Sequence, residues 1–177
     1  MTLMVKTTSM NQMRLQTLFK STNQMKIDIR IDDLSREESQ SIVREHMAGM
    51  LANTPIESVH ALPLDKLRQP NITFWTAWIE SELCGCGALQ TLDALHGEVK
   101  TMRTRAKFLR KGVAQAVLSH IINYASETGI KRLSLETGSS EVFLAARAMY
   151  LKNGFGICGP FGDYKLDPHS VFMTKRL

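Results

Sequence analysis

A long amphipathic helical pattern lies between two strand-like stretches in this chain, and it limits the folds that the chain can adopt. Apolar residues recur at helical spacing over residues 111–128, and Gly129 follows in the position of a helix C-cap. The stretches GEVKTMRT (97–104) before it and IKRLSLET (130–137) after it are typical of strands. A helix enclosed by strands in this way predicts a mixed α/β fold.

The other segments continue the alternation of strands and helices. A helix is predicted over residues 36–51, with the capping-box pair Ser35 and Glu38 at its start. Another begins at residues 139–140 and ends near Lys152. Further strands are predicted at 25–34, 72–80, 82–92, 155–162 and 170–177. Because short connections favour antiparallel pairing, we expect a single domain with a central mixed, mostly antiparallel sheet of six to seven strands flanked by helices.

Residues 1–24 differ in composition from the rest of the chain. They hold four of the ten methionines and three basic residues but no acidic residue, and they lack the long apolar block of a signal peptide. We expect an N-terminal extension, disordered or loosely packed, ahead of a domain over residues 25–177. An upstream start or a targeting peptide is the alternative interpretation.

Overall composition fits one globular domain. The chain has 177 residues, 44% hydrophobic and 22% charged, and no apolar run approaches the roughly 20 residues of a membrane span. The three cysteines form an odd set without a secretory signal, which favours reduced thiols in the cytoplasm. We therefore expect a cytoplasmic protein that does not bind membranes.

Two of the cysteines, Cys84 and Cys86, lie in the predicted strand ELCGCGAL. They are one residue apart, and no second Cys/His pair follows at the spacing of a zinc site. Alternating strand positions would place both thiols on one face. This arrangement favours buried small side chains, so we predict no metal site.

Basic residues gather just before the long helix. The chain has a net charge of +5, and five cations fall within nine residues without an acid among them: Arg103, Arg105, Lys107, Arg110 and Lys111. Such a run is usually a solvated face. Here Gly112 follows it directly and opens a helix, where free amides and the helix dipole attract anions. We therefore predict an anion site, although neither a Walker loop nor a dinucleotide fingerprint is present.

The stretch FLRKGVAQAVLSH (108–120) resembles the cofactor loop of the GNAT superfamily of acetyl-CoA-dependent N-acetyltransferases. That family carries Arg/Gln-x-x-Gly-x-Gly/Ala between its fourth strand and third helix. Gly112 and Ala114 match the pattern, whereas Leu109 stands at the Arg/Gln position. The resemblance extends over residues 25–177: GEVKTMRT is similar to the family's strand that holds the pantetheine arm, and ARAMYLKNGF (146–155) is similar to its A-x-x-x-Y-x-x-x-GF signature. Two further stretches, SVHALPLDKL (58–67) and GPFGDYKLDPHSVFM (159–173), resemble a bacterial subgroup of small GNAT proteins.

The resemblance implies acetyl-CoA as cofactor and assigns residues to it. Backbone groups of Met102, Arg103 and Thr104 would contact the acetyl and pantetheine parts. The pyrophosphate would be bound by the start of the long helix, at Arg110, Lys111, Gly112, Val113, Ala114 and Gln115.

Candidate catalytic residues come partly from the resemblance, which implies Tyr150 and Glu98, and partly from the predicted end of a strand at Glu136. Tyr150 is the candidate general acid, because it occupies the family's tyrosine position ahead of Asn-Gly-Phe. Two carboxylates compete as the base, Glu98 in GEVKTMRT and Glu136 in LSLETGS; either could act directly or through water. Candidate acceptor-binding residues are His60, Trp75 and Tyr164, with Asp167 and His169 as further possibilities.

The leading hypothesis is an N-acetyltransferase that acts on a primary amine of a small molecule or amino acid, as a monomer or homodimer. A protein N-terminus or lysine is an alternative acceptor. A CoA-binding regulatory module without turnover is a different class. Nucleic-acid binding fits poorly, because the cations are confined to one loop and no aromatic stacking pattern accompanies them.

Overall fold

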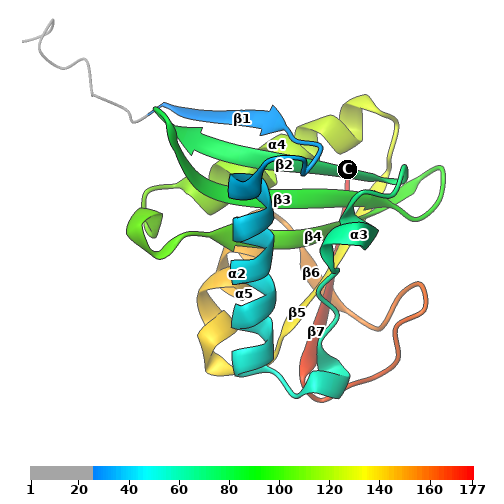
Figure 1. Cartoon of the computed structure of the whole chain (residues 1–177). Coiled ribbons are helices and arrows are strands. Elements are labelled where there is room, and N and C mark those ends of the chain that lie inside the picture. Colours follow the sequence, from blue (N-terminus) through cyan, green and yellow to red (C-terminus); the bar gives the residue numbers. More distant parts are fainter. Residues whose placement is uncertain (1–25) are drawn as a thin grey trace, which may run out of the picture.

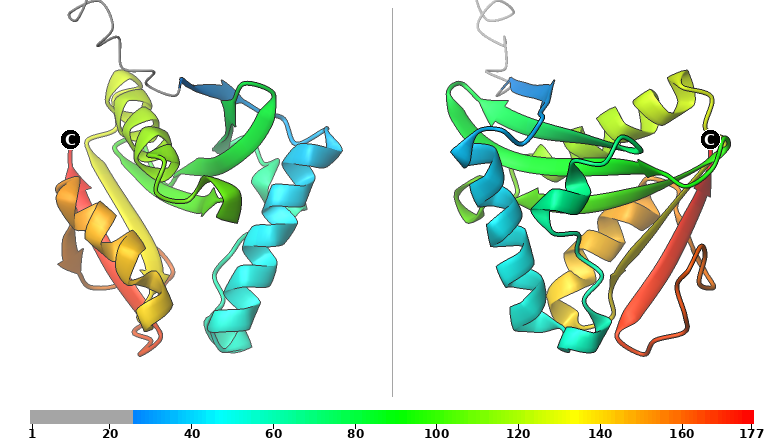
Figure 2. Two further views of the ribbon diagram at one scale, coloured as in Figure 1. Left: turned by 90° about the vertical axis from the view of Figure 1, so that its left-hand side faces the viewer. Right: turned by 45° about the vertical axis from the view of Figure 1, so that its right-hand side comes forward.

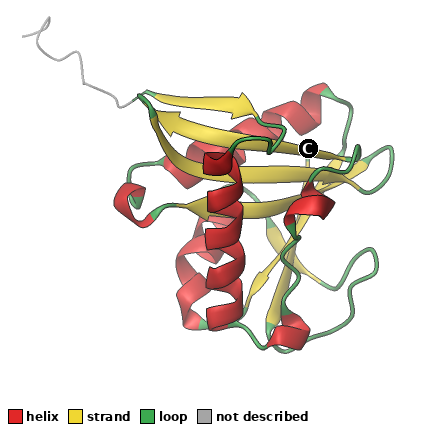
Figure 3. Cartoon of the chain, viewed as in Figure 1, coloured by secondary structure: helices red, strands yellow, loops and turns green. Residues whose placement is uncertain are grey.

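The computed structural model describes residues 26–177 (Figure 1), so the predicted extension over residues 1–24 lies outside the described residues. Figure 3 shows the alternation of strands and helices along the chain. The strands are β1 (Ile27–Ile31), β2 (Ile72–Ile79), β3 (Glu82–Thr91), β4 (His96–Thr104), β5 (Arg132–Gly138), β6 (Gly156–Cys158) and β7 (Ser170–Arg176). The helices are α2 (Glu37–Asn53), α3 (Leu64–Leu67), α4 (Val113–Glu127) and α5 (Leu144–Lys152), with 3₁₀ turns η1 (Ile56–Ser58), η2 (Ala106–Phe108) and η3 (Glu141–Phe143).

The seven strands form one sheet in the order β1-β2-β3-β4-β5-β7-β6. Every neighbouring pair is antiparallel except β4 and β5, which run parallel. A parallel pair needs a crossover connection, and α4 supplies it. The predicted mixed, mostly antiparallel sheet of six to seven strands flanked by helices is confirmed.

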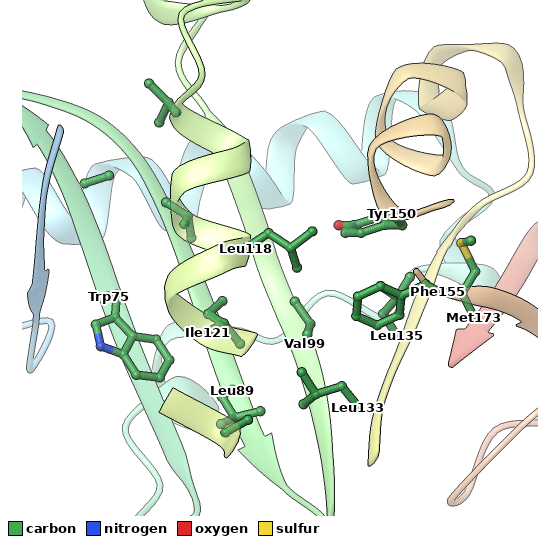
Figure 4. Packing of buried hydrophobic residues seen from close by; sticks show 14 of the residues in the cluster. Trp75, Leu89, Val99, Leu118, Ile121, Leu133, Leu135, Tyr150, Phe155 and Met173 are labelled. Carbon is green, nitrogen blue, oxygen red and sulfur yellow. The ribbon is translucent and has the colours of Figure 1, made fainter. Parts of the chain in front are cut away.

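Helices cover both faces of the sheet, as Figure 2 shows. One buried cluster joins α4 and α5 to the sheet, and Figure 4 shows Leu118 and Ile121 of α4 beside Val99 of β4. A second cluster joins Ile42 and Val43 of α2 to the opposite face. Because successive side chains of a strand point to opposite faces, β2 and β3 contribute residues to both clusters.

Glycines in β3 let α4 approach the sheet closely. A Cβ at Gly85 would lie 2.5 Å from Val113 Cγ1, and one at Gly87 would lie 2.6 Å from Val117 Cγ1. Any larger residue would therefore push the start of α4 away from the sheet. The position of the N-terminus of α4 against the sheet therefore depends on both glycines.

The two strand cysteines are buried and free, but they do not share a face. Cys84 belongs to the cluster under α4, and Cys86 belongs to the cluster under α2. The register of β3 with β2 shifts between Ala77 and Trp78, opposite this stretch. Such a bulge breaks the alternation, so the prediction of a single face was wrong. Within residues 26–177, no cluster of three or more His, Cys, Asp or Glu residues could hold a metal.

The predicted capping box at the start of α2 does not form. The helix begins after Arg36, and no side chain caps it. The buried carboxylate of Asp32 organises the segment instead, because it accepts hydrogen bonds from Ser39 Oγ and Arg36 (both 2.6 Å) and from the Leu34 amide (2.8 Å). The buried Asp32 carboxylate, with its several hydrogen-bond donors, thus takes the place of the predicted capping box of Ser35 and Glu38.

Strands β4 and β5 pair only over a short stretch and then diverge. Their ladder joins residues 96–98 to residues 132–134 and goes no further. Beyond it, β4 continues with β3 and β5 continues with β7. β4 also contains a register shift, and Thr101 there has a positive φ of 54°. The sheet is thus open at its centre.

Among the helices of residues 26–177, none combines the length and the apolar character that a membrane span requires.

Candidate active site

Three adjoining cavities form a trough where β4 and β5 diverge. The helix-side cavity, about 410 Å³, is bounded by α2, α4 and α5. The central chamber, about 100 Å³, lies between the diverging strands. The vestibule, about 780 Å³, is walled by the loop over residues 161–169 and by residues 57–60.

Shared lining residues connect the cavities. Met102 and Tyr150 line both the helix-side cavity and the chamber. His60, Glu98 and Lys100 line both the chamber and the vestibule. The trough therefore leads from the start of α4, across the open centre of the sheet, to the loop side of the molecule.

The start of α4 presents free backbone amides. Gly112 is the N-cap residue, with a φ of 82° that favours glycine, and no side chain caps the helix. The first amide to donate to a preceding carbonyl is that of Ala116, to Gly112 O at 2.9 Å. The amides of residues 113–115 thus have no carbonyl partner within the helix. Arg110 and Lys111 stand exposed beside them.

Tertiary contacts divide the cation cluster into two groups. Arg105 pairs with Glu45 on α2 at 2.8 Å, and Lys107 pairs with Glu82 on β3. The described residues supply no acidic partner in an ion pair for the other three cations, which are Arg103, Arg110 and Lys111. The cations left to attract an anion therefore lie near the helix start.

Polar atoms along the diverging part of β4 have no partner among residues 26–177. They are Thr101 Oγ1, Arg103 Nε and Thr104 Oγ1, all buried. Thr101 lines the chamber, and Met102, Arg103 and Thr104 line the helix-side cavity. A buried polar group without a partner costs about 1–3 kcal/mol, so this edge suits a polar ligand. The free amides of α4 suit a phosphate group of a ligand in the helix-side cavity.

Tyr150 projects from α5 into the trough. Its ring is 5% exposed and packs edge-on against Phe155, with ring centres 5.9 Å apart. Figure 4 shows the hydroxyl oxygen pointing away from α5 toward α4. Burial, with the nearby Glu136 charge, raises the pKa of Tyr150. The side chain is therefore a neutral phenol at physiological pH.

The first candidate base, Glu98, is held by two neighbours. Its Oε1 accepts a hydrogen bond from Lys100 Nζ at 2.9 Å and one from the Tyr164 hydroxyl at 2.6 Å. Lys100 Nζ also donates to the Tyr164 oxygen at 2.7 Å. Both charged side chains are less than one-tenth exposed. This closed triad forms the passage between the chamber and the vestibule, together with His60.

The second candidate base, Glu136, stands on β5 across the chamber. Its Oε1 accepts one hydrogen bond, from Ser170 Oγ at 2.7 Å. Burial raises the pKa of this carboxyl, while Ser170, His60 and Lys100 oppose the shift. The divergence of β4 and β5 thus places a carboxylate on each wall of the same chamber.

Two of the three predicted acceptor residues reach the trough. His60 and Tyr164 line the vestibule and contact each other edge-on, with ring centres 5.0 Å apart. Asp167 and His169 line the vestibule as well. Trp75 does not: it is 1% exposed and packs against Tyr124 of α4. The expectation for Trp75 was wrong, because its strand position faces the core under α4.

Sequence reasoning missed several residues that line the chamber. His46 and Met50 were only part of a helical pattern, yet α2 brings both to the trough. Burial, with the charges of Arg103 and Lys100, lowers the pKa of His46 to about 4. Lys100 could have been noticed, since it lies two residues from Glu98 and so shares its strand face. The position of the unpartnered Thr101 hydroxyl depends on the register shift between β3 and β4, which no local sequence pattern indicates.

Comparison of the sequence with known proteins identifies its relatives. The model of the acetyltransferase (GNAT) family matches residues 33–155. The uncharacterized N-acetyltransferase YsnE of Bacillus subtilis (strain 168) is 57% identical over 149 residues, 84% of this chain and 99% of that protein. The uncharacterized N-acetyltransferase YedL of Escherichia coli (strain K12) is 49% identical over 149 residues, 84% of this chain and 94% of that protein.

A solved structure shares the fold. The crystal structure of a GNAT family acetyltransferase from Elizabethkingia anophelis, with acetyl-CoA bound, superposes with a TM-score of 0.63. The match covers 85% of this chain and 98% of that chain at 20% sequence identity. The family match and the two close relatives show that this chain is an N-acetyltransferase of the GNAT family.

Proposed function

We propose that this N-acetyltransferase transfers the acetyl group of acetyl-CoA to a primary amine of a small molecule or amino acid. The observation that carries the proposal is the trough, which leads from the free amides of α4 to a vestibule on the other side of the sheet. Its narrow centre holds a buried phenol and two carboxylates, which are the groups that acyl transfer to an amine needs.

The helix-side cavity is the proposed cofactor site. The amides of Val113, Ala114 and Gln115 would bind the pyrophosphate, with Gly112 allowing close approach and Arg110 and Lys111 adding positive charge. Main-chain groups of Met102, Arg103 and Thr104 would hold the pantetheine arm along β4. When bound, acetyl-CoA supplies the thioester carbonyl that the amine attacks and the sulfur that leaves.

Glu136 is the proposed base. Its pKa is raised by burial and it has a single hydroxyl donor, so it can take a proton from the amine directly or through one water. Glu98 is less suited, because Oε1 already accepts two hydrogen bonds, one of them from an ammonium group. We assign Glu98 the role of positioning Lys100 and Tyr164 at the passage.

Tyr150 is the proposed acid. A thiol has an ordinary pKa of about 8.5, so the leaving sulfur needs a nearby proton donor at neutral pH. The raised pKa of Tyr150 keeps its hydroxyl protonated, and its side chain reaches both the chamber and the helix-side cavity. The phenol would donate to the sulfur while Glu136, which lines the same chamber, accepts from the nitrogen.

Two measurements test the proposal. Saturating acetyl-CoA should raise the melting temperature by mass action, and a panel of primary amines should release free CoA thiol. A thermal shift without thiol release for any amine would favour a CoA-binding regulatory module. Thiol release with a peptide N-terminus or lysine peptide, and not with small amines, would favour a protein acetyltransferase. The absence of both effects would refute the proposal.

A further inference from the structure

The chamber limits the shape of the group that can reach the acetyl donor. Its volume is about 100 Å³, against about 780 Å³ for the vestibule. The chamber is therefore about one-eighth the size of the vestibule. A constriction of this kind favours an amine nitrogen at the end of an unbranched carbon chain. A branched carbon that also carries a carboxylate must stay in the vestibule.

A buried hydroxyl in the chamber marks where a polar atom of the ligand belongs. Thr101 is 6% exposed, and its Oγ1 has no hydrogen-bond partner among the described residues. It lines the chamber, together with Glu136 on the opposite strand. A primary amine between these strands would donate one N–H to Thr101 Oγ1 and remove the cost of leaving that oxygen unpaired.

The vestibule is acidic although the chain as a whole has a net charge of +5. Four carboxylates line it, against two ammonium groups; these six residues are Glu57, Glu98, Asp163, Asp167, Lys100 and Lys165. Glu98 is neutralised by Lys100. Glu57 and Asp163 are exposed, and neither takes part in an ion pair within residues 26–177. A cation in the vestibule would be attracted to them.

We infer that the acceptor is a small aliphatic diamine: a primary amine on an unbranched carbon chain whose second, positively charged end lies in the vestibule near Glu57 and Asp163. The inference rests on the proposed function and specifies its substrate. The amine nitrogen forms a bond to the acetyl carbon as the carbon–sulfur bond breaks. The nitrogen loses its proton toward Glu136, and the sulfur gains one from Tyr150. The distal ammonium keeps its charge throughout.

The test compares four acceptors with the full-length enzyme and acetyl-CoA: 1,4-diaminobutane, n-butylamine, alanine and an N-terminally blocked lysine peptide. We expect kcat/KM for the diamine to exceed that for butylamine by about 5-fold, as two solvent-exposed charge contacts would give. Alanine should react least. Equal or better turnover of butylamine, alanine or the peptide would overturn the inference. No thiol release with any amine would instead refute the proposed function.

Two vestibule substitutions and a matched control test the charge contacts. The double variant Glu57→Gln/Asp163→Asn should raise KM for the diamine about 2- to 5-fold per carboxylate, and should raise KM for butylamine by less. The control Glu38→Gln/Glu127→Gln changes net charge equally at exposed sites that line none of the three cavities. If both double variants behave alike, the vestibule carboxylates do not bind the acceptor.

Thr101→Val tests the chamber hydroxyl. Valine has nearly the same shape, so we expect KM to rise about 5-fold for the diamine and for butylamine alike. The melting temperature of the free enzyme should stay the same or increase, because an unpaired buried oxygen is removed. An unchanged KM for both amines would show that Thr101 does not contact the acceptor.

Discussion

The Lys100 ammonium lies 2.9 Å from the Glu98 carboxylate, and both side chains are less than one-tenth exposed. This pair stands at the point where β4 leaves β5, and Tyr164 closes it from the vestibule side. One of the two chamber carboxylates is thus committed to an ion pair. The other, Glu136, has only a hydroxyl donor and a raised pKa. We therefore expect Glu98 to contribute mainly to stability and Glu136 to contribute mainly to catalysis.

Glu98→Gln should destabilise the fold more than it alters the chemistry. Removing one partner of a buried ion pair leaves the other charge uncompensated, which costs about 3–5 kcal/mol. The double variant Glu98→Gln/Lys100→Met should recover most of this stability, since it removes both charges. Urea denaturation of the three proteins measures the effect. A double variant no more stable than Glu98→Gln would show that the pair does not act as a unit.

Glu136→Gln should lower kcat by about 10²- to 10⁴-fold, because the amide cannot accept the amine proton. In the wild type, activity should fall as the pH drops through the pKa of Glu136, which burial raises above its ordinary value of 4.5. The acid limb of the pH–rate profile should therefore lie higher than for a solvent-exposed carboxyl. Profiles of kcat for wild type and variant check this. Activity that survives in Glu136→Gln and vanishes in Glu98→Gln would exchange the two roles.

Tyr150→Phe should slow transfer by about 10²-fold or more while acetyl-CoA still raises the melting temperature. The ring packing against Phe155 is retained, so the fold should be nearly as stable as the wild type. Tyr124→Phe is the control, because this tyrosine packs on Trp75 and lines none of the three cavities. Equal rates for both variants would remove Tyr150 from the mechanism.

Gly112→Ala and Gly129→Ala form a matched pair at the two ends of α4. Both glycines have positive φ, 82° and 90°, and an added Cβ would meet nothing within 4 Å at either position. Each substitution should therefore cost about 1 kcal/mol of backbone strain. Only Gly112→Ala should also weaken acetyl-CoA binding, because its Cβ stands beside the free amides. Calorimetric titration with CoA separates the two; equal affinities would contradict the proposed phosphate site.

His46 should make the stability of the protein depend on pH. Burial, with the Arg103 and Lys100 charges, lowers its folded-state pKa to about 4. The unfolded chain, with an ordinary pKa of about 6.5, binds the proton more readily. The stabilising contribution is therefore complete above about pH 6.5 and is lost as the pH falls toward 4, on the order of 1–3 kcal/mol. His46→Gln should flatten the melting-temperature profile over this range and leave its slope unchanged above it.

Much of the fold was predictable because its signals are local. Helical periodicity identified α4 to within two residues at its N-terminus, and Gly129 was expected at its end. Alternating and β-branched residues identified the strands, and short connections indicated antiparallel neighbours. The loop that we propose for the cofactor could be located for the same reason, since a helix start and its glycine are adjacent in the chain.

The remaining features depend on pairings between distant segments. The Glu98–Tyr164 hydrogen bond joins residues 66 positions apart, and no local pattern reports it. The bulge in β3 separated Cys84 from Cys86, and the sheet orientation buried Trp75 beneath α4. Strand register and divergence are set by packing across the whole sheet. Amino-acid patterns therefore specified the elements and the glycine at the start of α4, while the tertiary fold assigned each carboxylate its partners and shaped the vestibule.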